Sequence, residues 1–378
     1  MIKPNSKPYQ QCTRCVMDTS DPEIQFNEKG QCNHCTDFFE NKLMFTYHGE
    51  KSDRQLKELV SVIKTKSKNN KYDALLGISG GVDSCYMAYK CKEIGLNPLL
   101  FHLDNGWNSE ISARNIENVS NYLGFDLVTH VMPWEEFKDV QLAHLRASTP
   151  ELETPTDIAI LEHLHKVAVR HNIPFIIMGG NYISESILPK SWHYNPKDLV
   201  YSRHVHALFG EKKVKNFPSF TFWYEAYCKL IKRIKILYLL NYVNYNKHDS
   251  MTTLKKIGWQ EYGEKHHESI YTKVVQSYIL PIKFNIDYRK ATLSNKICSG
   301  EMKREDVLEI LKLKPYNEHT IRGEIEYVCK KLEISVTEFD LIMERKPQTF
   351  ESYKNEKQKL ESIYALYRRF SKKLPHSI

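Results

Sequence analysis

A hexapeptide rich in glycine and serine is the segment of this chain best suited to bind an anion. It reads Ser79-Gly80-Gly81-Val82-Asp83-Ser84, after a short apolar run and before residues that favour a helix. Backbone N–H groups at a helix N-terminus attract phosphate, and glycine lets the backbone approach it closely. Asp83 would repel a bare phosphate, so we expect its carboxylate to hold Mg²⁺ against one. No Lys-Ser or Lys-Thr pair follows the glycines, which distinguishes the segment from a Walker loop.

Four cysteines near the N-terminus have the spacing of a metal site. Cys12 and Cys15 form one Cys-x-x-Cys pair, and Cys32 and Cys35 form a second. Four thiolates complete a tetrahedral shell without an open position, so a Zn²⁺ ion bound there would be structural. An iron–sulfur cluster and unligated thiols are the alternatives. His34 lies within the second pair and is expected to be a bystander, because four cysteines suffice.

Alternating strand and helix patterns surround the hexapeptide and must position it. Strands are expected at 73–78, 98–103, 125–131 and 174–178, and helices within 50–70 and at 110–123 and 155–171. This alternation predicts an α/β fold, doubly wound, with a mainly parallel sheet whose ligands bind at the carboxyl ends of the strands. Asp104 and the turn Gly179-Gly180-Asn181 follow the second and fourth strands, at that same edge.

Composition limits the class of protein. The 378 residues are 41% apolar and 26% charged, which is typical of a globular chain with a sizeable core. The net charge of +8 fits a binder of nucleotides, anionic sugars, nucleic acid or a membrane surface, without selecting among them. The sequence has no apolar run that could span a membrane and no signal-peptide core, so we expect a cytoplasmic location. Nine cysteines in a reducing compartment are then metal ligands or buried thiols.

The hexapeptide resembles the pyrophosphate-binding loop of the PP-loop ATP pyrophosphatases, which have an adenine nucleotide alpha hydrolase-like fold. Those enzymes cut ATP into AMP and pyrophosphate in order to adenylate a substrate oxygen. The resemblance implies that residues 79–84 bind ATP and that Asp104 meets the adenosine. It also implies that Gly179, Gly180 and Asn181 lie near the nucleotide phosphates.

A second group of titratable residues lies at 258–269 and contains Lys265, His266, His267 and Glu268. A lysine beside histidines and glutamates can stabilise charge on phosphate and move protons, although composition alone fits a solvated loop equally well. The cysteine pairs, the hexapeptide, this segment and Cys298-Ser299-Gly300 together resemble the N-acetyl sugar amidotransferases of bacterial LPS O-antigen and surface-polysaccharide synthesis. The resemblance covers roughly residues 9–310.

This resemblance implies an ATP-dependent ligase that turns an acetamido group of a nucleotide-activated sugar into an acetamidino group. The amide oxygen is adenylated with release of pyrophosphate, and ammonia then displaces AMP. Asp83 would help to hold Mg²⁺, Lys265 would neutralise charge near the α-phosphate, and His266, His267 or Glu268 would manage the ammonia protons. ATP, Mg²⁺ and structural Zn²⁺ are the cofactors implied. A 2,3-diacetamido uronic acid and a nonulosonic acid are both open as the sugar.

The chain has no ammonia source of its own. No cysteine follows the initiator Met, and no Gly-x-Cys-x-Gly elbow occurs, so neither kind of glutaminase site is present. The resemblance therefore implies two separate partners, a glutaminase and a cyclase-like subunit that passes ammonia on. Assembly into a homo-oligomer and a peripheral membrane contact are both left open.

Four parts are predicted along the chain. Residues 1–48 form the zinc-binding module, 49–190 the PP-loop ATP-binding domain, 191–255 an aromatic and basic helical insertion, and 256–378 a substrate-side cluster with C-terminal helices. In the insertion, aromatic residues at 217–245 are interleaved with basic ones. We favour packing on the core or on a second subunit over an amphipathic helix on an anionic membrane, with RNA contact as a third interpretation.

Two other function classes compete with the amidotransferase. A PP-loop tRNA thiolase would suit the basic charge, but it normally needs further cysteines near the active site. Apart from the N-terminal four, none of the other cysteines forms a further Cys-x-x-Cys pair. These are Cys85, Cys91, Cys228, Cys298 and Cys329. A zinc-ribbon RNA-binding protein without catalytic activity would leave the hexapeptide unexplained.

Overall fold

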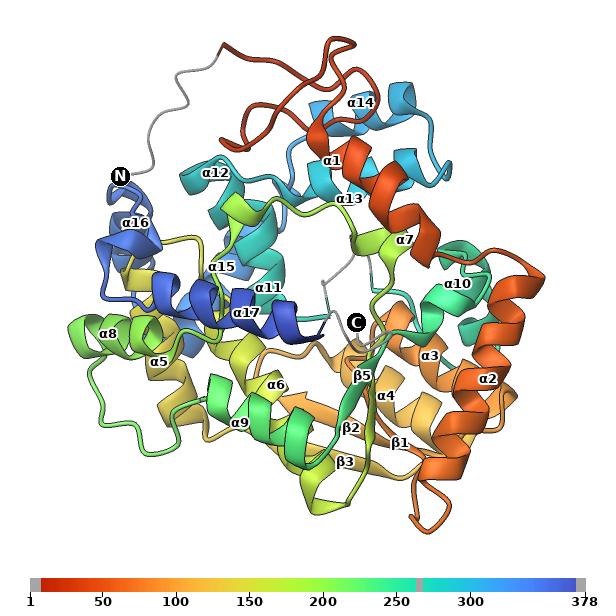
Figure 1. Ribbon diagram of the computed structural model, residues 1–378. Helices are drawn as coiled ribbons and strands as arrows, with labels where there is room; N and C mark the ends of the chain where they lie inside the picture. The colour runs from red at the N-terminus through yellow and green to blue at the C-terminus, as the bar shows by residue number, and fades with distance from the viewer. Residues whose placement is uncertain (1–7, 263–267, 372–378) are drawn as a thin grey trace.

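A parallel five-stranded sheet is the scaffold of the molecule (Figure 1). The computed structural model describes residues 8–262 and 268–371. The strands lie in the order β3-β2-β1-β4-β5, and every neighbouring pair is parallel. The order reverses between β1 and β4, which confirms the predicted doubly wound sheet. The strands are β1 (Ala74–Gly77), β2 (Pro98–Asp104), β3 (Leu127–Val131), β4 (Phe175–Ile177) and β5 (Lys235–Leu237).

Helices connect the strands and cover both faces of the sheet. The strands and helices expected from the sequence up to β4 are confirmed, and α5, which follows Pro133, is an addition to them. Pro155 lies in the first turn of α6, where its missing N–H costs nothing. The helices of this part are α2 (Glu50–Lys66), α3 (Val82–Glu93), α4 (Glu110–Leu123), α5 (Trp134–Arg146), α6 (Thr154–Arg170) and α7 (Tyr182–Glu185).

Side chains that alternate along the strands fill two separate cores, one on each side of the sheet. Leu75 of β1 belongs to a core that includes Leu164 of α6. The next residue, Leu76, belongs to a core that includes Met87 of α3. Both faces of the sheet are therefore covered, as is usual for parallel strands linked by helices.

The segment predicted as a helical insertion also supplies a strand. Besides its helices it contains β5, which pairs with β4 at the edge of the sheet. Its aromatic side chains divide between two environments, since Phe220 is buried whereas Trp223 is 77% exposed. The helices here are α8 (Leu199–Phe209), α9 (Phe222–Ala226), a π-helical turn (Tyr227–Ile231), a 3₁₀ turn (Leu239–Tyr242) and α10 (Lys247–Lys255).

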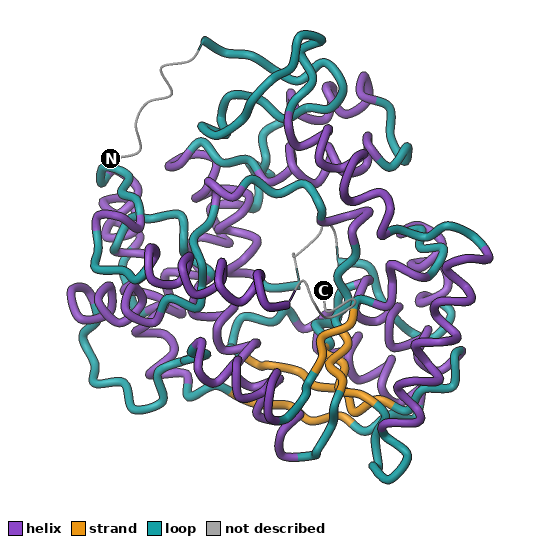
Figure 2. Tube along the Cα trace, in the orientation of Figure 1, coloured by secondary structure: helices purple, strands orange, loops and turns teal. Residues whose placement is uncertain are grey.

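The C-terminal region is helical, as expected, and Figure 2 shows that strands are confined to one part of the molecule. A π-helical turn (Val275–Ile279) joins its first two helices. Within the described residues, no helix is long and apolar enough to cross a membrane. The helices are α11 (Ile270–Val274), α12 (Leu280–Phe284), α13 (Tyr288–Cys298), α14 (Arg304–Lys312), α15 (Ile321–Leu332), α16 (Val336–Glu344) and α17 (Lys357–Ser371).

The cysteine module contains α1 (Asn33–Asp37) and packs against α13 and α14 (Figure 1). The amide of Val16 donates to Ser294 Oγ at 3.3 Å. Arg304 donates through Nε to the carbonyl of Cys15 and through Nη2 to that of Cys12, each at 2.9 Å. These contacts fix the N-terminal module to the C-terminal helices.

Replacing Leu76 by Ala should destabilise the protein far more than the same change at Leu127. Leu76 lies in the central strand and is fully buried, whereas Leu127 lies in the edge strand β3 and is 36% exposed. A buried Leu→Ala change costs about 2–5 kcal/mol through lost burial and the cavity left behind. At the exposed site the cost should be about 0.5 kcal/mol. Urea denaturation measures both, and equal midpoint shifts would contradict the assignment of Leu76 to the core.

Candidate active site and metal centre

The hexapeptide forms a tight turn between β1 and α3, and Gly80 is its most constrained residue. Gly80 has φ +82°, and a Cβ added there would lie 2.5 Å from the carbonyl oxygen of Ser112. Only glycine meets both conditions without strain. The carbonyl of Gly80 accepts hydrogen bonds from Trp259 Nε1 at 2.9 Å and from Asn115 Nδ2 at 3.3 Å. Residues far along the chain thus hold the turn in place.

The two serines of the turn organise its polar groups. Ser84 Oγ accepts from the amide of Ser79 at 3.1 Å and donates to the carbonyl of Gly81 at 3.2 Å. The amide of Gly81 donates to Ser79 Oγ at 3.3 Å. Gly81 is the N-cap of α3 and has no side chain to accept from the first amides of that helix. The first N–H groups of α3 thus receive no side-chain cap from Gly81, and binding of an anion there stays a prediction.

Asp83 lies in the first turn of α3 and contacts a tyrosine from the segment between β5 and α10, far along the chain. The hydroxyl of Tyr245 donates to Asp83 Oδ1. Burial first, and then the charge of Asp83, raises the pKa of Tyr245 well above its usual value, so the phenol keeps its proton. Sequence reasoning missed Tyr245, because nothing in the aromatic run 217–245 distinguishes it from its neighbours.

Glu268 reaches the turn from the C-terminal region. Ser79 Oγ donates to Glu268 Oε1 at 3.3 Å, and the carbonyl of Glu268 accepts from the amide of Ser109 at 2.8 Å. Its other oxygen, Oε2, is buried and has no hydrogen-bond partner among the described residues. Of the predicted titratable cluster, Lys265, His266 and His267 lie outside the residues that the structure describes.

The turn after β4 also adjoins the hexapeptide. A Cβ on Gly179 would lie 2.9 Å from both the Cα and the amide nitrogen of Ser84, so glycine permits this approach. Asn181 caps α7 by accepting from the amide of Ser184 at 2.9 Å. In the part of the chain that the structure describes, its buried Nδ2 finds no hydrogen-bond acceptor. The turn after β4 and the hexapeptide therefore lie next to each other. The roles predicted for their residues in ATP binding, including those of Val82 and Gly180, stay predictions.

Asp104 lies at the end of β2 beside a cavity of about 260 Å³. Its Oδ1 accepts from the amide of Gly106 at 2.9 Å. The cavity is also lined by Lys331, whose Nζ lies 4.7 Å from the ring centroid of Trp134 and 5.0 Å from that of Trp107. Burial lowers the pKa of Lys331, and the charge of Asp104 opposes that shift. A carboxylate, a cation and aromatic rings here could receive a polar planar group.

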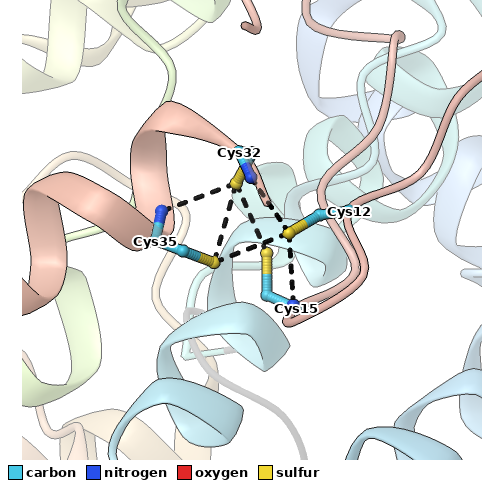
Figure 3. Close-up of side chains that lie close together, drawn as sticks. All are labelled: Cys12, Cys15, Cys32 and Cys35. Atoms are coloured by element: carbon cyan, nitrogen blue, oxygen red, sulfur yellow. Dashed lines mark hydrogen bonds between the residues drawn. The ribbon is translucent and has the colours of Figure 1, made fainter. Parts of the chain in front are cut away.

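The four predicted cysteines converge on one buried point (Figure 3). Their Sγ atoms lie 3.7 Å apart for Cys12 and Cys35, 3.7 Å for Cys15 and Cys32, and 3.6 Å for Cys32 and Cys35. His34 is not part of the group, because its Nε2 pairs with Asp21 at 2.7 Å. The Cys-x-x-Cys spacing in the sequence and the close approach of the four Sγ atoms in space therefore both indicate a candidate metal site.

Cys298, of the predicted Cys298-Ser299-Gly300 motif, lies beside this metal centre rather than beside the hexapeptide. Its Sγ is 3.8 Å from that of Cys35. The motif therefore belongs to the contact between α13 and the cysteine module.

If residues 79–84 bind ATP as predicted, replacing Gly80 by Ala should weaken ATP binding, whereas the same change at Gly95 should not. Both glycines have positive φ, so each substitution costs about 1–2 kcal/mol of backbone strain. A Cβ at Gly95 meets no atom within 4 Å, but at Gly80 it collides with the backbone of Ser112. We expect Gly80→Ala to lower ATP affinity by about tenfold or more, measured by calorimetry with Mg²⁺. Equal affinities in the two variants would show that the turn does not hold the nucleotide.

One protein-family model matches the C-terminal part of the chain. Residues 268–369 match the family model described as "LPS biosynthesis protein WbpG-like, C-terminal domain". The comparison with curated proteins gave no match.

Two solved structures are similar at low scores. An NH3-dependent NAD synthetase from Campylobacter jejuni shares 15% identity, covering 54% of this chain and 83% of that one, with a TM-score of 0.28. The U34-tRNA thiolase NcsA from Methanococcus maripaludis, which carries a 4Fe–4S cluster, shares 14% identity, covering 80% and 89%, with a TM-score of 0.32. Scores this low carry no functional conclusion. The match to the WbpG-like model is therefore a similarity of residues 268–369, a little over a quarter of the chain, to a domain described for LPS biosynthesis.

Proposed function

We propose that this protein is an ATP-dependent amidotransferase that converts an acetamido group of a nucleotide-activated sugar into an acetamidino group. One contact carries the proposal, namely the 3.3 Å hydrogen bond from Ser79 of the turn to Glu268. Glu268 is the first residue of the WbpG-like domain. The turn that we propose to bind an anion thus contacts the part of the chain that matches a domain described for LPS biosynthesis. The resemblance of the turn to a PP-loop supports ATP as the nucleotide.

Activation of the amide is the first step proposed. An acetamido carbonyl is a poor electrophile, and its oxygen is a poor leaving group. That oxygen attacks the α-phosphorus of ATP, a new P–O bond forms, and the bond to pyrophosphate breaks. The amides and hydroxyls of residues 79–84 would hold the departing pyrophosphate. By resemblance, Lys265 would balance charge near the α-phosphate.

Two carboxylates beside the turn suit a divalent cation. Asp83 lies in the first turn of α3, and Glu268 accepts from Ser79. Carboxylate oxygens are ligands that Mg²⁺ prefers, and a bound Mg²⁺ would neutralise charge on the phosphates. With Glu268 on the phosphate side, His266 and His267 remain as the sequence-based candidates for proton transfer from ammonia.

Ammonia completes the proposed reaction. It attacks the activated carbon, a C–N bond forms, and the C–O bond breaks as AMP leaves with the electron pair. The sequence has no glutaminase motif, so we propose that a separate glutaminase and a cyclase-like subunit supply the ammonia. The surface-polysaccharide family supports a nucleotide-linked acetamido sugar as the acceptor.

The geometry of the four cysteines favours one tetrahedral ion over a cluster. An ion bound about 2.3 Å from four sulfurs places them about 3.8 Å apart. The separations of 3.6–3.7 Å fit that geometry. The cysteines of a cubane cluster bind four different irons and therefore lie farther apart. We propose structural Zn²⁺, whose binding would hold a module that is too small for a core of its own.

A tRNA thiolase is the second candidate. Sulfur transfer needs a reactive thiolate near the nucleotide, and Cys85 follows the turn directly. Cys85 is fully buried, and burial raises the pKa of its thiol well above the usual range. All nine cysteines of the chain are buried. This observation counts against thiolation and favours the amidotransferase.

The function is tested by incubating the protein with ATP, Mg²⁺, ammonium and a panel of nucleotide-linked acetamido sugars. We expect sugar-dependent AMP and pyrophosphate, with a product in which one oxygen is replaced by NH in mass spectra. Asp83→Asn should lower the rate by about 10² or more, because the cation loses a charged ligand. Asp53→Asn, at an exposed position in the first turn of α2, is the matched control and should be silent.

The same assay separates the two enzymes. Adenylation that depends on tRNA and a sulfur donor, without any sugar dependence, would transfer the assignment to a thiolase. Sugar-dependent AMP formation without a product in which NH has replaced oxygen would contradict the amidotransferase but keep the adenylation step.

Replacing Cys15 by Ser should remove the metal and loosen the N-terminal module. We expect bound zinc, measured by elemental analysis, to fall from about one ion per chain toward zero, with a lower Tm. Cys91→Ser is the matched control, because Cys91 is equally buried but lies outside the sulfur cluster. Iron and acid-labile sulfide in the wild-type protein would contradict the zinc proposal.

A further inference from the structure

A helical segment beside the edge strand β5 has apolar side chains on both of its faces. It consists of α9 (Phe222–Ala226) and the π-helical turn that continues it (Tyr227–Ile231). Figure 1 shows α9 on the opposite side of the molecule from the cysteine module. A helix on the surface of a globular protein normally exposes polar residues on its outer face. An outer face that is apolar instead marks a surface with a partner.

The inner face of the segment packs on the rest of the protein. Cys228 is fully buried, and its carbonyl accepts from the amide of Ile234 at 2.9 Å. Phe222 packs against Tyr364 of α17, with ring centroids 6.1 Å apart. These contacts hold the helix in place and leave its other face toward solvent.

Four apolar side chains form a stripe on that outer face, called here the outer stripe. Trp223 is 77% exposed, Leu230 is 63% and Ile231 is 70%, and Tyr227 between them is 38% exposed. Their positions recur every three or four residues, which places them along one side of a helix. Single exposed apolar residues are ordinary, but a continuous stripe of large ones indicates an interaction surface.

Exposed cations follow the outer stripe directly. Lys232, Arg233 and Lys235 all lie at the surface. Lys232 Nζ is 5.9 Å from the ring centroid of Tyr227, so its charge lies at the rim of the stripe. Long basic side chains can lay their stems along an apolar surface while their charged ends reach a polar layer.

The exposed charges of this part of the chain are all positive. Glu225 is the one carboxylate within residues 221–235. It is 7% exposed, and Lys197 and Lys229 each approach it at 2.7 Å. Its charge is therefore buried and balanced, and the outward charge of the segment complements an anionic surface.

The outer stripe adjoins the amino end of the sheet, away from the candidate active site. Lys235 is the first residue of β5, and its amide donates to the carbonyl of Pro174, just before β4. The hexapeptide follows the carboxyl end of β1, and β1, β4 and β5 are parallel. Docking through the outer stripe would therefore leave the carboxyl edge of the sheet open to soluble substrates.

We propose that the outer stripe and the adjacent cations dock this protein on a bilayer that contains anionic phospholipids. Trp223 and Tyr227 are residue types that favour the boundary between headgroups and acyl chains. Leu230 and Ile231 enter the acyl boundary, and the adjacent cations pair with headgroup phosphates. Aromatic and aliphatic side chains beside charges of one sign are the chemistry of a helix that lies on a membrane surface.

The test mixes the full chain with vesicles of phosphatidylcholine, with or without phosphatidylglycerol, and measures binding by co-sedimentation. We expect binding to vesicles that contain phosphatidylglycerol and little binding to phosphatidylcholine alone. Ile231→Ser should weaken that binding by about tenfold, because apolar burial is lost. Lys232→Gln should weaken it by about fivefold, because one charge is lost. Added salt should weaken it as well.

Tryptophan fluorescence locates the contact. Trp223 is exposed, whereas the other four tryptophans are buried or half-buried. Its emission should therefore move to shorter wavelength when anionic vesicles are added. Trp223→Phe keeps an aromatic ring at this position and should remove most of that shift.

Leu313→Ser is the matched control for Ile231→Ser, because Leu313 is 68% exposed at the end of α14. It should bind vesicles like the wild type, with the same Tm as Ile231→Ser. Equal vesicle binding by these two variants would overturn the inference, and so would wild-type protein that does not bind anionic vesicles. A wild-type dimer that Ile231→Ser separates without any change in vesicle binding would instead assign the outer stripe to a second copy of this chain.

Discussion

The close approach of Gly80 to the carbonyl oxygen of Ser112 is the constraint on which the candidate active site depends. It demands a residue without Cβ and a backbone in the left-handed region, and the sequence supplies glycine there. The carbonyl of Gly80 is held from outside by Trp259 and Asn115, which come from two other elements. The turn is therefore ordered before any ligand arrives. A preorganised turn can present its amides to phosphate without a further loss of conformational entropy.

The charged side chains beside the turn then limit which ligands it can bind. Asp83 and Glu268 both adjoin the turn, so a polyphosphate would meet two carboxylates as well as the helix N-terminus. Such a site binds a nucleotide well only together with a cation.

The cysteine module links the two ends of the chain. Arg304 binds the carbonyls of Cys12 and Cys15, and Cys298 lies beside Cys35. A metal bound by the four cysteines would therefore stabilise α13 and α14 as well as its own loops. These helices belong to the WbpG-like domain, which also begins with Glu268. Metal binding and the position of α13 and α14 are thus expected to be coupled.

Local patterns by themselves determined the first four strands, the helices between them except α5, the glycine-rich turn and the four-cysteine cluster. Hydrophobic periodicity, glycine and Cys-x-x-Cys spacing act over a few residues, so they are visible in sequence. The tertiary structure alone decided the rest. The strand β5 has three residues within an aromatic run and exists because it pairs with β4. The contacts of Tyr245 with Asp83 and of Thr272 with Glu153 join residues far apart in the chain. Which distant side chains meet depends on packing of the whole core, and no local signal carries that information.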